Sequence, residues 1–422
     1  MATNASGLQI LVVGGGLAGL AAASFLRKQH QVTVLERSKL DYSRNDYAIS
    51  VAPNTQRLLL EQGMEMSNLE AAVLNYIWRC DADGTLISET LSESVARLGA
   101  ASIFTRRSRL QAELQSLATG VRQPGNPARI IDEVRISAVD VAEGKITTES
   151  GETYRGDLII GADGINSAVR DAVLSAKLGP VDVSGGGAAV PSGLVVYLCT
   201  VPRAGLRDDS LLAFQTREKS GMACFYGRDP RTRVFVFPAD ANNFQIAAYY
   251  PEDGWVEHFA QARSSIIKDV SVERTLQDFV DFHPSIQKLF ISAATRDVWR
   301  IRDLDRLSDW QSGKAILIGD AAHAVTPHFG TGCNTAIEDG EALGYFFRDI
   351  TSAAQIPAAL QSFKALRMPR AHIIQFASRH VGERLSEEER ENAGQFDLKA
   401  FVAKTSGYTS AEDAWKALGV GH

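Results

Sequence analysis

The stretch that decides the fold, residues 8–37, reads LQILVVGGGLAGLAAASFLRKQHQVTVLER. Residues 8–13 form a branched apolar run typical of a buried parallel strand, and glycines end the run before a helix-forming segment. Gly14, Gly16 and Gly19 have the G-x-G-x-x-G spacing. The first glycine permits a tight turn, the second a close approach of pyrophosphate, and the third close packing of helix on strand. The stretch therefore predicts a Rossmann-like unit that binds an adenine dinucleotide.

An acidic residue completes this unit. Glu36 ends the next predicted strand, 20 residues after Gly16, where a carboxylate can accept hydrogen bonds from ribose hydroxyls. Two alternatives exist for this stretch. A membrane span is disfavoured by the central glycines and the missing basic flank, and a simple tight turn would leave Glu36 a coincidence.

The composition indicates a globular protein with an acidic balance. The 422 residues are 45% hydrophobic and 22% charged, with a formal net charge of −6. A chain of this length is large enough for two subdomains. No Lys/Arg-rich block is present, so nucleic acid and anionic membranes are disfavoured as partners. The cysteines lack C-x-x-C spacing and the histidines form no H-E-x-x-H motif. We therefore expect no metal site, no stable membrane insertion and a cytoplasmic location.

Two later strands also end at an acid beside a glycine. Residues 157–162 run into Asp163-Gly164, and residues 315–318 end at Gly319-Asp320. Gly330-x-Gly332 then opens a helix whose N–H groups could face a partly negative ring oxygen. The alternatives are that Asp163 only caps the helix after it, and that the glycines only serve the loop dihedral angles.

Three arginines lie at another predicted helix start, at positions 106, 107 and 109. Positive charge is unfavourable at a helix N-terminus unless an anion binds there, so one of them is expected to contact a phosphate or a cofactor.

The middle of the chain predicts a second unit. Between Leu194 and Tyr250 the segments LVVYLCTV, LLAFQ, MACFYG, RVFVFP and FQIAAYY predict an antiparallel sheet with one face free for an apolar ligand. Residues 184–187 and 191–193 resemble a linker, and helices are expected over 255–267 and 276–290.

The predicted fold class is α/β with three parts. They are a discontinuous dinucleotide-binding domain with a parallel sheet (1–183 and 296–380), an antiparallel-sheet substrate domain (184–295) and a C-terminal helical segment (381–422).

Three motifs together resemble a known family. They are G-G-G-L-A-G-L with Glu36-Arg37, the Asp163-Gly164 strand end, and L-I-G-D-A-A-H-A-x-x-P at residues 317–327. This set is similar to the single-component flavin monooxygenases, the aromatic hydroxylase family that includes salicylate and 4-hydroxybenzoate hydroxylases. The resemblance implies FAD as cofactor, NADH or NADPH as reductant, O2 as co-substrate and a flavin C4a-hydroperoxide as the oxygenating species.

The resemblance also implies FAD contacts by position in these motifs. They are Gly14, Gly16 and Gly19 at the pyrophosphate, Glu36 at the ribose, Asp320 at the ribityl chain, and Ala48, Pro327, Gly330, Gly332 and Cys333 near the isoalloxazine ring. Arg37, Arg107 and Asp163 are further implied FAD contacts, and Asp163 is also implied for NAD(P)H.

The chain departs from the family pattern at three places. Asp46-Tyr47-Ala48-Ile49 stands where many members have Gly-Ala-Gly-Ile, Tyr197-Leu198 where relatives often have Tyr-Arg, and Cys333 where a small Gly or Ala is usual. The loop beside the flavin is therefore expected to be bulkier.

The substrate is expected to be a small phenolic or hydroxybenzoate-type aromatic molecule. Tyr226, Tyr249 and His328 are the candidates to take or share its proton, and Arg217 and Arg228 could bind a carboxylate. Oxygen entering at a carboxylated carbon would expel CO2. The alternatives are an epoxidase or hydroxylase of an isoprenoid or larger natural product, and a non-catalytic FAD-fold binding protein. The oligomeric state is left open.

Overall fold

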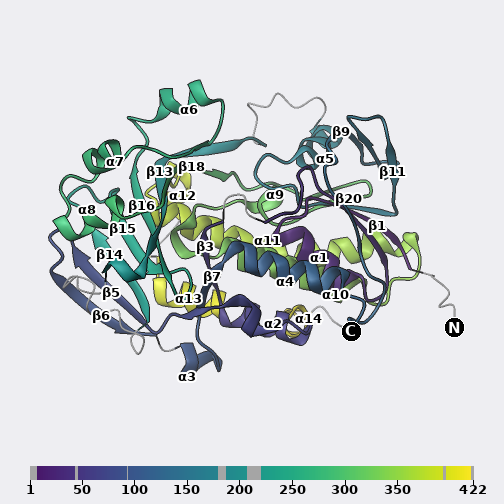
Figure 1. Cartoon of the computed structure of the whole chain (residues 1–422). Helices are drawn as coiled ribbons and strands as arrows, with labels where there is room; N and C mark the ends of the chain where they lie inside the picture. Colours follow the sequence, from purple (N-terminus) through teal and green to yellow (C-terminus); the bar gives the residue numbers. More distant parts are fainter. Residues whose placement is uncertain are drawn as a thin grey trace.

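The computed structural model describes residues 7–42, 46–92, 94–178, 187–206, 220–392 and 396–419. Figure 1 shows two bodies side by side, one built on a mainly parallel sheet and the other on a larger, mainly antiparallel sheet.

The parallel-sheet body contains six strands. They are β1 (Gln9–Val13), β2 (Gln31–Leu35), β8 (Arg129–Ile131), β12 (Leu158–Gly161), β19 (Gln311–Ser312) and β20 (Ala315–Leu317). Their order is β19-β20-β12-β1-β2-β8, and only β19 runs antiparallel to its neighbour. Val12, Ile160 and Ile316 are fully buried, as expected for strands covered on both faces. Because β1, β12 and β20 are parallel neighbours, the turns that follow them meet at one edge of the sheet.

Three helices stack beside this sheet. They are α1 (Leu17–Leu26), α4 (Arg107–Thr119) and α10 (Gly332–Phe347), and α1 packs between the other two. A Cβ at Gly340 of α10 would lie 2.7 Å from the backbone nitrogen of Ala22, so the absence of a side chain lets α10 approach α1 closely. On another part of the sheet α5 (Ala168–Leu178) packs against β19 and β20.

The second body contains an eight-stranded sheet. Its strands are β5 (Tyr76–Asp81), β6 (Leu86–Leu91), β13 (Ala189–Pro202), β14 (Gly221–Tyr226), β15 (Arg233–Pro238), β16 (Asn243–Pro251), β17 (Ile266–Ile267) and β18 (Thr295–Leu304). Their order is β17-β18-β13-β16-β15-β14-β5-β6, and all neighbours are antiparallel except β14 and β5. The two faces separate by alternation along each strand. Tyr197 packs with Phe279 and Phe290 on the face covered by helices, whereas Val196 packs with Ala48 and Phe104 of the first body.

The helices over the outer face are α6 (Val256–Ala262), α7 (Val272–Asp278) and α8 (Pro284–Ile291). The smaller elements are β3 (Ala48–Val51), α2 (Pro53–Glu61), η1 (Met66–Leu69), β4 (Ala72–Val73), α3 (Ser94–Leu98), β7 (Ile103–Arg106), β9 (Ile136–Asp140), β10 (Lys145–Thr148), β11 (Thr153–Arg155) and η2 (Arg203–Leu206).

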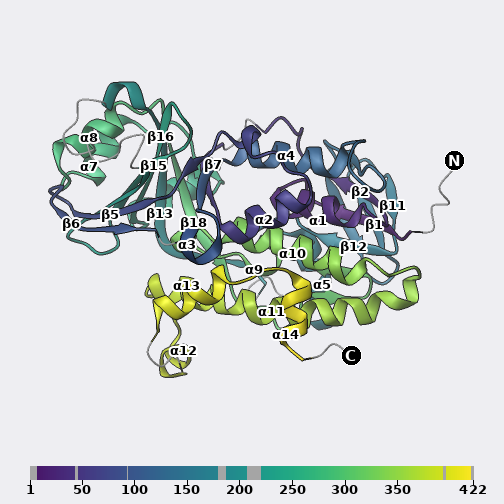
Figure 2. The same ribbon diagram turned by 90° about the horizontal axis from the view of Figure 1, so that it is seen from below.

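The C-terminal third adds helices to the parallel-sheet body. They are α9 (Asp320–His323), η4 (Pro327–Phe329), η5 (Ala353–Gln355), α11 (Ile356–Val381), α12 (Glu387–Asn392), α13 (Leu398–Ser406) and α14 (Ala411–Ala417). Figure 2 shows α10 and α11 side by side, with α13 and α14 lying against them. Among the helices of the described residues, none has the length and apolar character needed to cross a bilayer.

The predicted α/β class is confirmed, and several local predictions are wrong. The helix expected over 255–267 ends at Ala262, because Ile266–Ile267 pairs with β18 as β17. The helix expected over 276–290 is two helices, since Pro284 starts a new one. Residues 191–193 lie inside β13 at a register shift and are not a linker. Residues 184–186 and the LLAFQ segment lie outside the described residues.

The eight-stranded sheet also draws on residues outside 184–295. β5 and β6 precede that range and β18 runs beyond it, yet all three are hydrogen bonded into the sheet. The division into three parts stays a prediction, and its boundaries must allow for these strands.

Candidate functional site

In the turn after β1, each motif glycine is present for a different structural reason. Gly14 has φ +105°, and a Cβ there would lie 2.4 Å from the carbonyl oxygen of Ala162. A Cβ on Gly19 would lie 1.9 Å from the oxygen of Gly14, whereas a Cβ on Gly16 would meet nothing within 4 Å. Gly16 is also the N-cap of α1, with no side chain capping its N–H groups. The turn thus leaves an open, donor-rich surface at a helix N-terminus, which fits a pyrophosphate.

Glu36 lies against this turn. Its carboxylate accepts hydrogen bonds from the backbone N–H of Gly15 at 2.7 Å and of Ser38 at 2.9 Å. These contacts fix the carboxylate beside the glycines and leave lone pairs that can accept hydrogen bonds from a ribose. Arg37, by contrast, is exposed.

Asp320 begins α9 at the end of β20. Its side chain is exposed at the surface with protein atoms packed around the carboxylate, and we propose that it lines the cofactor cleft, the region that Arg107, Tyr47 and Cys333 share. Burial raises the pKa of Asp320, and His323, Arg107 and Arg170 oppose that shift. A carboxylate in this position can accept hydrogen bonds from a polyol chain.

Arg107 and Tyr47 lie near Asp320 but belong to other parts of the chain. Arg107 is the first residue of α4, and its backbone N–H donates to the Tyr47 carbonyl at 2.9 Å. Within the described ranges the Arg107 guanidinium makes no hydrogen bond or ion pair. The Tyr47 ring meets Trp299 edge to face, with centroids 5.5 Å apart. Burial raises the pKa of Tyr47, with Arg107 opposing and Asp320 and Cys333 reinforcing the shift. The loop beside the cleft thus places a large aromatic group among these residues.

Asp163 acts as a helix cap. Its carboxylate accepts hydrogen bonds from the Ser167 hydroxyl at 2.5 Å and from the backbone N–H of Val169 at 3.2 Å. Burial raises the pKa of Asp163 against these hydrogen bonds. The capping alternative is therefore observed, and a cofactor contact for Asp163 stays a prediction.

The loop that opens α10 is tied to β3. The Asn334 side chain donates to the oxygens of Gly330 at 2.9 Å and Ser50 at 3.1 Å, and accepts from the N–H of Ala52 at 2.8 Å. The Cys333 thiol donates to the oxygen of Ser50 at 3.2 Å, and burial raises the pKa of Cys333 to about 12. Cys333 therefore acts as a thiol that joins the loops and not as a thiolate.

The remaining residues assigned to the ring side lie in the same region. Gly330 has φ +61° and follows η4, whose first residue is Pro327. Gly332 is the first residue of α10, and Ala48 is buried at the start of β3.

The cleft-facing side of the large sheet is apolar and aromatic. Tyr249 belongs to the cluster that joins the two bodies, together with Ala247, Phe237 and Ile301 and with the partly buried Trp299. Rings follow one another across this face: Tyr226 meets Phe235 at 6.3 Å, and Phe235 meets Tyr249 at 5.5 Å. Tyr226 and Tyr249 thus share one face, as a substrate role requires.

His328 from η4 meets this face at Arg233. The guanidinium donates to Nδ1 of His328 at 3.2 Å and lies over the Tyr249 ring, 5.1 Å from its centroid. Arg233 has no acidic partner in the part of the chain that the structure describes, and its Nε is buried without a hydrogen bond. Burial, reinforced by Arg233 and Arg384, lowers the pKa of His328 to about 3. His328 is therefore neutral, with its proton on Nε2 because Nδ1 accepts from the arginine.

Two residues of the candidate site were not predicted from the sequence. Arg233 could have been found by alternation, because it lies two residues before Phe235 on the cleft-facing side of β15. Asn334 carried no signal of its own, since its partners are distant in sequence. Arg228 is exposed, Arg217 lies outside the described residues, and no cluster that could hold a metal occurs among those described.

Comparison with known proteins agrees with this geometry. The family model described as "FAD binding domain" matches residues 7–377. Hispidin-3-hydroxylase of Neonothopanus nambi is 29% identical over 388 residues, which cover 89% of this chain and 88% of that protein. Salicylate hydroxylase of Pseudomonas putida is 27% identical over 397 residues, covering 91% and 87%.

Among solved structures, HpxO of Klebsiella pneumoniae, complexed with FAD and uric acid, matches with a TM-score of 0.71. Its identity is 23%, and the match covers 97% of this chain and 95% of that one. At this identity the likeness shows the fold. The family match over most of the chain, with the three turns at one sheet edge, shows that the chain belongs to the FAD-binding-domain family of aromatic hydroxylases and is a flavin-dependent monooxygenase.

Proposed function

We propose that this enzyme hydroxylates an anionic aromatic substrate of the phenol or hydroxybenzoate type, with NADH or NADPH as reductant and O2 as co-substrate. The observation that carries the proposal is the Arg233 guanidinium, which faces the cleft without an acidic partner among the described residues. A partly buried cation is costly unless it is paired. A phenolate or carboxylate would complete the pair.

An aromatic substrate suits the rest of the face. Phe235 and Tyr249 offer ring surfaces beside Arg233, and Trp299 lies on the same face three strands away. Aromatic pairs stabilise a complex beyond the area that they bury. An aromatic anion would therefore have its charge at Arg233 and its ring against these side chains, which also exclude water.

The three candidate proton acceptors are better suited to hold protons. Burial raises the pKa of Tyr249 to about 12, with Arg233 opposing, and burial also raises the pKa of Tyr226. Nδ1 of His328 is occupied by Arg233. We infer that the substrate binds as its anion, that Arg233 lowers the pKa of a bound phenol, and that Tyr226 or Tyr249 donates a hydrogen bond to it.

The FAD site proposed here follows the sheet edge. Gly14, Gly16 and Gly19 with the start of α1 would hold the pyrophosphate, Glu36 the ribose and Asp320 the ribityl chain. Arg107, unpaired within the described ranges, would bind a phosphate or the ring. Ala48, Pro327, Gly330, Gly332 and Cys333 would lie near the isoalloxazine. When bound, FAD would accept electrons from NAD(P)H and activate O2.

The proposal also covers loss of CO2 during hydroxylation and, as a second candidate, a larger substrate. A substrate oxygenated at its carboxylated carbon would lose CO2. A larger natural product is the second candidate, because the cleft-facing cluster also includes Leu74, Leu198 and Met222 and so extends beyond the width of one ring. We also propose that Asp163 contacts NAD(P)H, that the chain divides into the three parts given above, and that the protein is cytoplasmic.

The test compares NADH and NADPH oxidation by the FAD-loaded enzyme with salicylate, 4-hydroxybenzoate and phenols against salicylamide and other neutral isosteres. Product mass, CO2 and peroxide are recorded together. The proposal expects anionic aromatics to stimulate oxidation and to yield a product heavier by one oxygen, or by one oxygen less CO2. Stimulation by neutral polyenes or isoprenoids alone would refute it.

A further inference from the structure

A buried ionic network lies behind the turn that presents Asp320. Asp339, fully buried in α10, accepts hydrogen bonds from the backbone N–H of Gly319 at 3.0 Å, from Nε2 of His323 at 2.7 Å and from Nε of Arg367 at 2.9 Å. Gly319 immediately precedes Asp320, and His323 ends the short helix that Asp320 begins. Asp339 therefore holds both ends of α9.

The turn at Gly319 needs such an anchor. Gly319 has φ +57° and ψ −145°, and a Cβ there would lie 2.8 Å from the Cβ of Ala18 in α1. A backbone in this sparsely populated region persists only where its surroundings determine it. The N–H bond to Asp339 is the polar contact that fixes the turn against α10.

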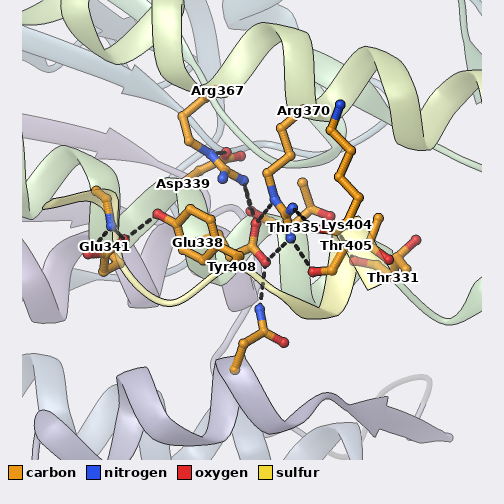
Figure 3. Close-up of polar contacts among 12 residues, drawn as sticks. Thr331, Thr335, Glu338, Asp339, Glu341, Arg367, Arg370, Lys404, Thr405 and Tyr408 are labelled. Carbon is orange, nitrogen blue, oxygen red and sulfur yellow. Dashed lines mark hydrogen bonds and ion pairs between the residues drawn. The ribbon is translucent and has the colours of Figure 1, made fainter. Parts of the chain in front are cut away.

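The charge on Asp339 is balanced inside the protein. Although burial alone would raise the pKa of Asp339, His323 and Arg367 hold it below its ordinary value. Arg367 is itself fully buried and also pairs with Glu338 at 3.0 Å. Figure 3 shows Arg367 beside Asp339 and shows Arg367 and Arg370 converging on Glu338. An ionised carboxylate is thus available at the turn, and removing its charge would leave a buried guanidinium short of a partner.

A second arm of the network serves a different purpose. Arg370 binds Glu338 at 2.6 Å and donates to the carbonyl oxygens of Lys404 and Thr405, while Glu341 accepts from the Tyr408 hydroxyl at 2.6 Å. This arm attaches the C-terminal helices to α10, as Figure 3 shows, and among the described residues none of these four contacts involves Gly319 or His323.

We propose that Asp339 is a positioning residue for FAD: by binding Gly319 and His323 it sets the place of the Asp320 carboxylate in the cofactor cleft. The inference rests on the proposed contact of Asp320 with the ribityl chain. Asp339 lies outside the cleft, yet it would contribute to the affinity for FAD.

The test is a double-mutant cycle read by FAD affinity. Apoproteins carrying Asp320→Asn, Asp339→Asn and both changes are titrated with FAD by flavin fluorescence. Each single change is expected to raise the FAD Kd by about tenfold. The double variant is expected to bind about as weakly as Asp320→Asn alone, because Asp339 acts through Asp320.

The outcomes separate the claims. No effect of Asp320→Asn would overturn the ribityl assignment. An effect of Asp320→Asn with no effect of Asp339→Asn, or with additive losses, would overturn the positioning role alone. Glu341→Gln, in the second arm of the same helix, is the matched control and is expected to leave the FAD Kd unchanged. If Asp339→Asn does not fold, His323→Gln takes its place in the cycle, with the same expectation.

Discussion

The guanidinium of Arg233 donates a hydrogen bond to Nδ1 of His328 at 3.2 Å, which joins the large sheet to the loop in front of α10. Because arginine only donates, the bond fixes the tautomer of the histidine and fixes the direction of the cation. The pair links the body that would hold the cofactor to the face that would hold the substrate.

Replacing Arg233 by Met should weaken recognition of an anionic substrate. A hydrogen bond to a charged group contributes about 1.5–3 kcal/mol, so kcat/KM should fall roughly 10- to 100-fold for hydroxybenzoates. Neutral phenols should lose much less. Arg231→Met removes an exposed arginine that pairs with Asp229 and is the control. Equal losses for charged and neutral substrates would argue against an anion anchor.

Replacing His328 by Gln tests its role in holding Arg233. A KM that rises with kcat nearly unchanged is expected, since Gln can still accept from the guanidinium but fixes it less well. Titration of FAD into the apoprotein should give an unchanged Kd. A collapse of kcat at constant KM would instead show that His328 takes part in the chemistry.

Stability should depend on pH through His328. Its pKa is about 3 in the folded protein against an ordinary 6.5, so between these values the unfolded chain binds a proton that the folded protein does not. The contribution is fully present above about pH 6.5 and is lost as the pH falls towards 3. Urea unfolding from pH 7 to 4 should show a shallower loss in His328→Gln than in the wild type. If the unfolding free energies of the two proteins change equally with pH, the lowered pKa of His328 is contradicted.

The glycines of the first turn should separate into two kinds. Gly16→Ala places its Cβ in open space, so the apoprotein should keep its stability to within about 0.5 kcal/mol while the FAD Kd rises. Gly19→Ala drives its Cβ against the Gly14 oxygen, and overpacking of this kind costs about 1–3 kcal/mol. Thermal unfolding of both apoproteins and FAD titration measure the difference. A destabilised Gly16→Ala would remove the argument for an open pyrophosphate surface.

Shortening Tyr47 should let water into the cleft. Tyr47→Ala removes the ring that meets Trp299, so more of the NAD(P)H consumed should appear as peroxide when the cleft is less well closed. Tyr47→Phe keeps the ring and should stay near the wild-type ratio of product to peroxide. If both variants give the wild-type ratio of hydroxylated product to peroxide, the ring has no part in closing the cleft.

Much of the cofactor side could be predicted from sequence because its signals are local. The spacing of Gly14, Gly16 and Gly19 encodes a turn within a few residues, and apolar runs encode buried strands. The helix expected over 255–267 was wrong because Ile266–Ile267 joins β18, a pairing with Trp299 and Val298, which lie more than 30 positions away. The same limit hid the place of β5 in the large sheet, because its partner β14 lies far along the chain, and β6 joins the sheet only through β5.

The sequence by itself determined the α/β class, the order of the three acid-bearing or glycine-bearing turns and the dinucleotide chemistry. Backbone dihedral limits and side-chain periodicity act over short distances and leave a readable pattern. Only the tertiary structure decided that Arg233 meets His328, that Asn334 ties α10 to β3, and that Asp339 holds the turn of Asp320. These contacts join residues from separate elements, and packing of the whole chain selects which polar groups are buried together.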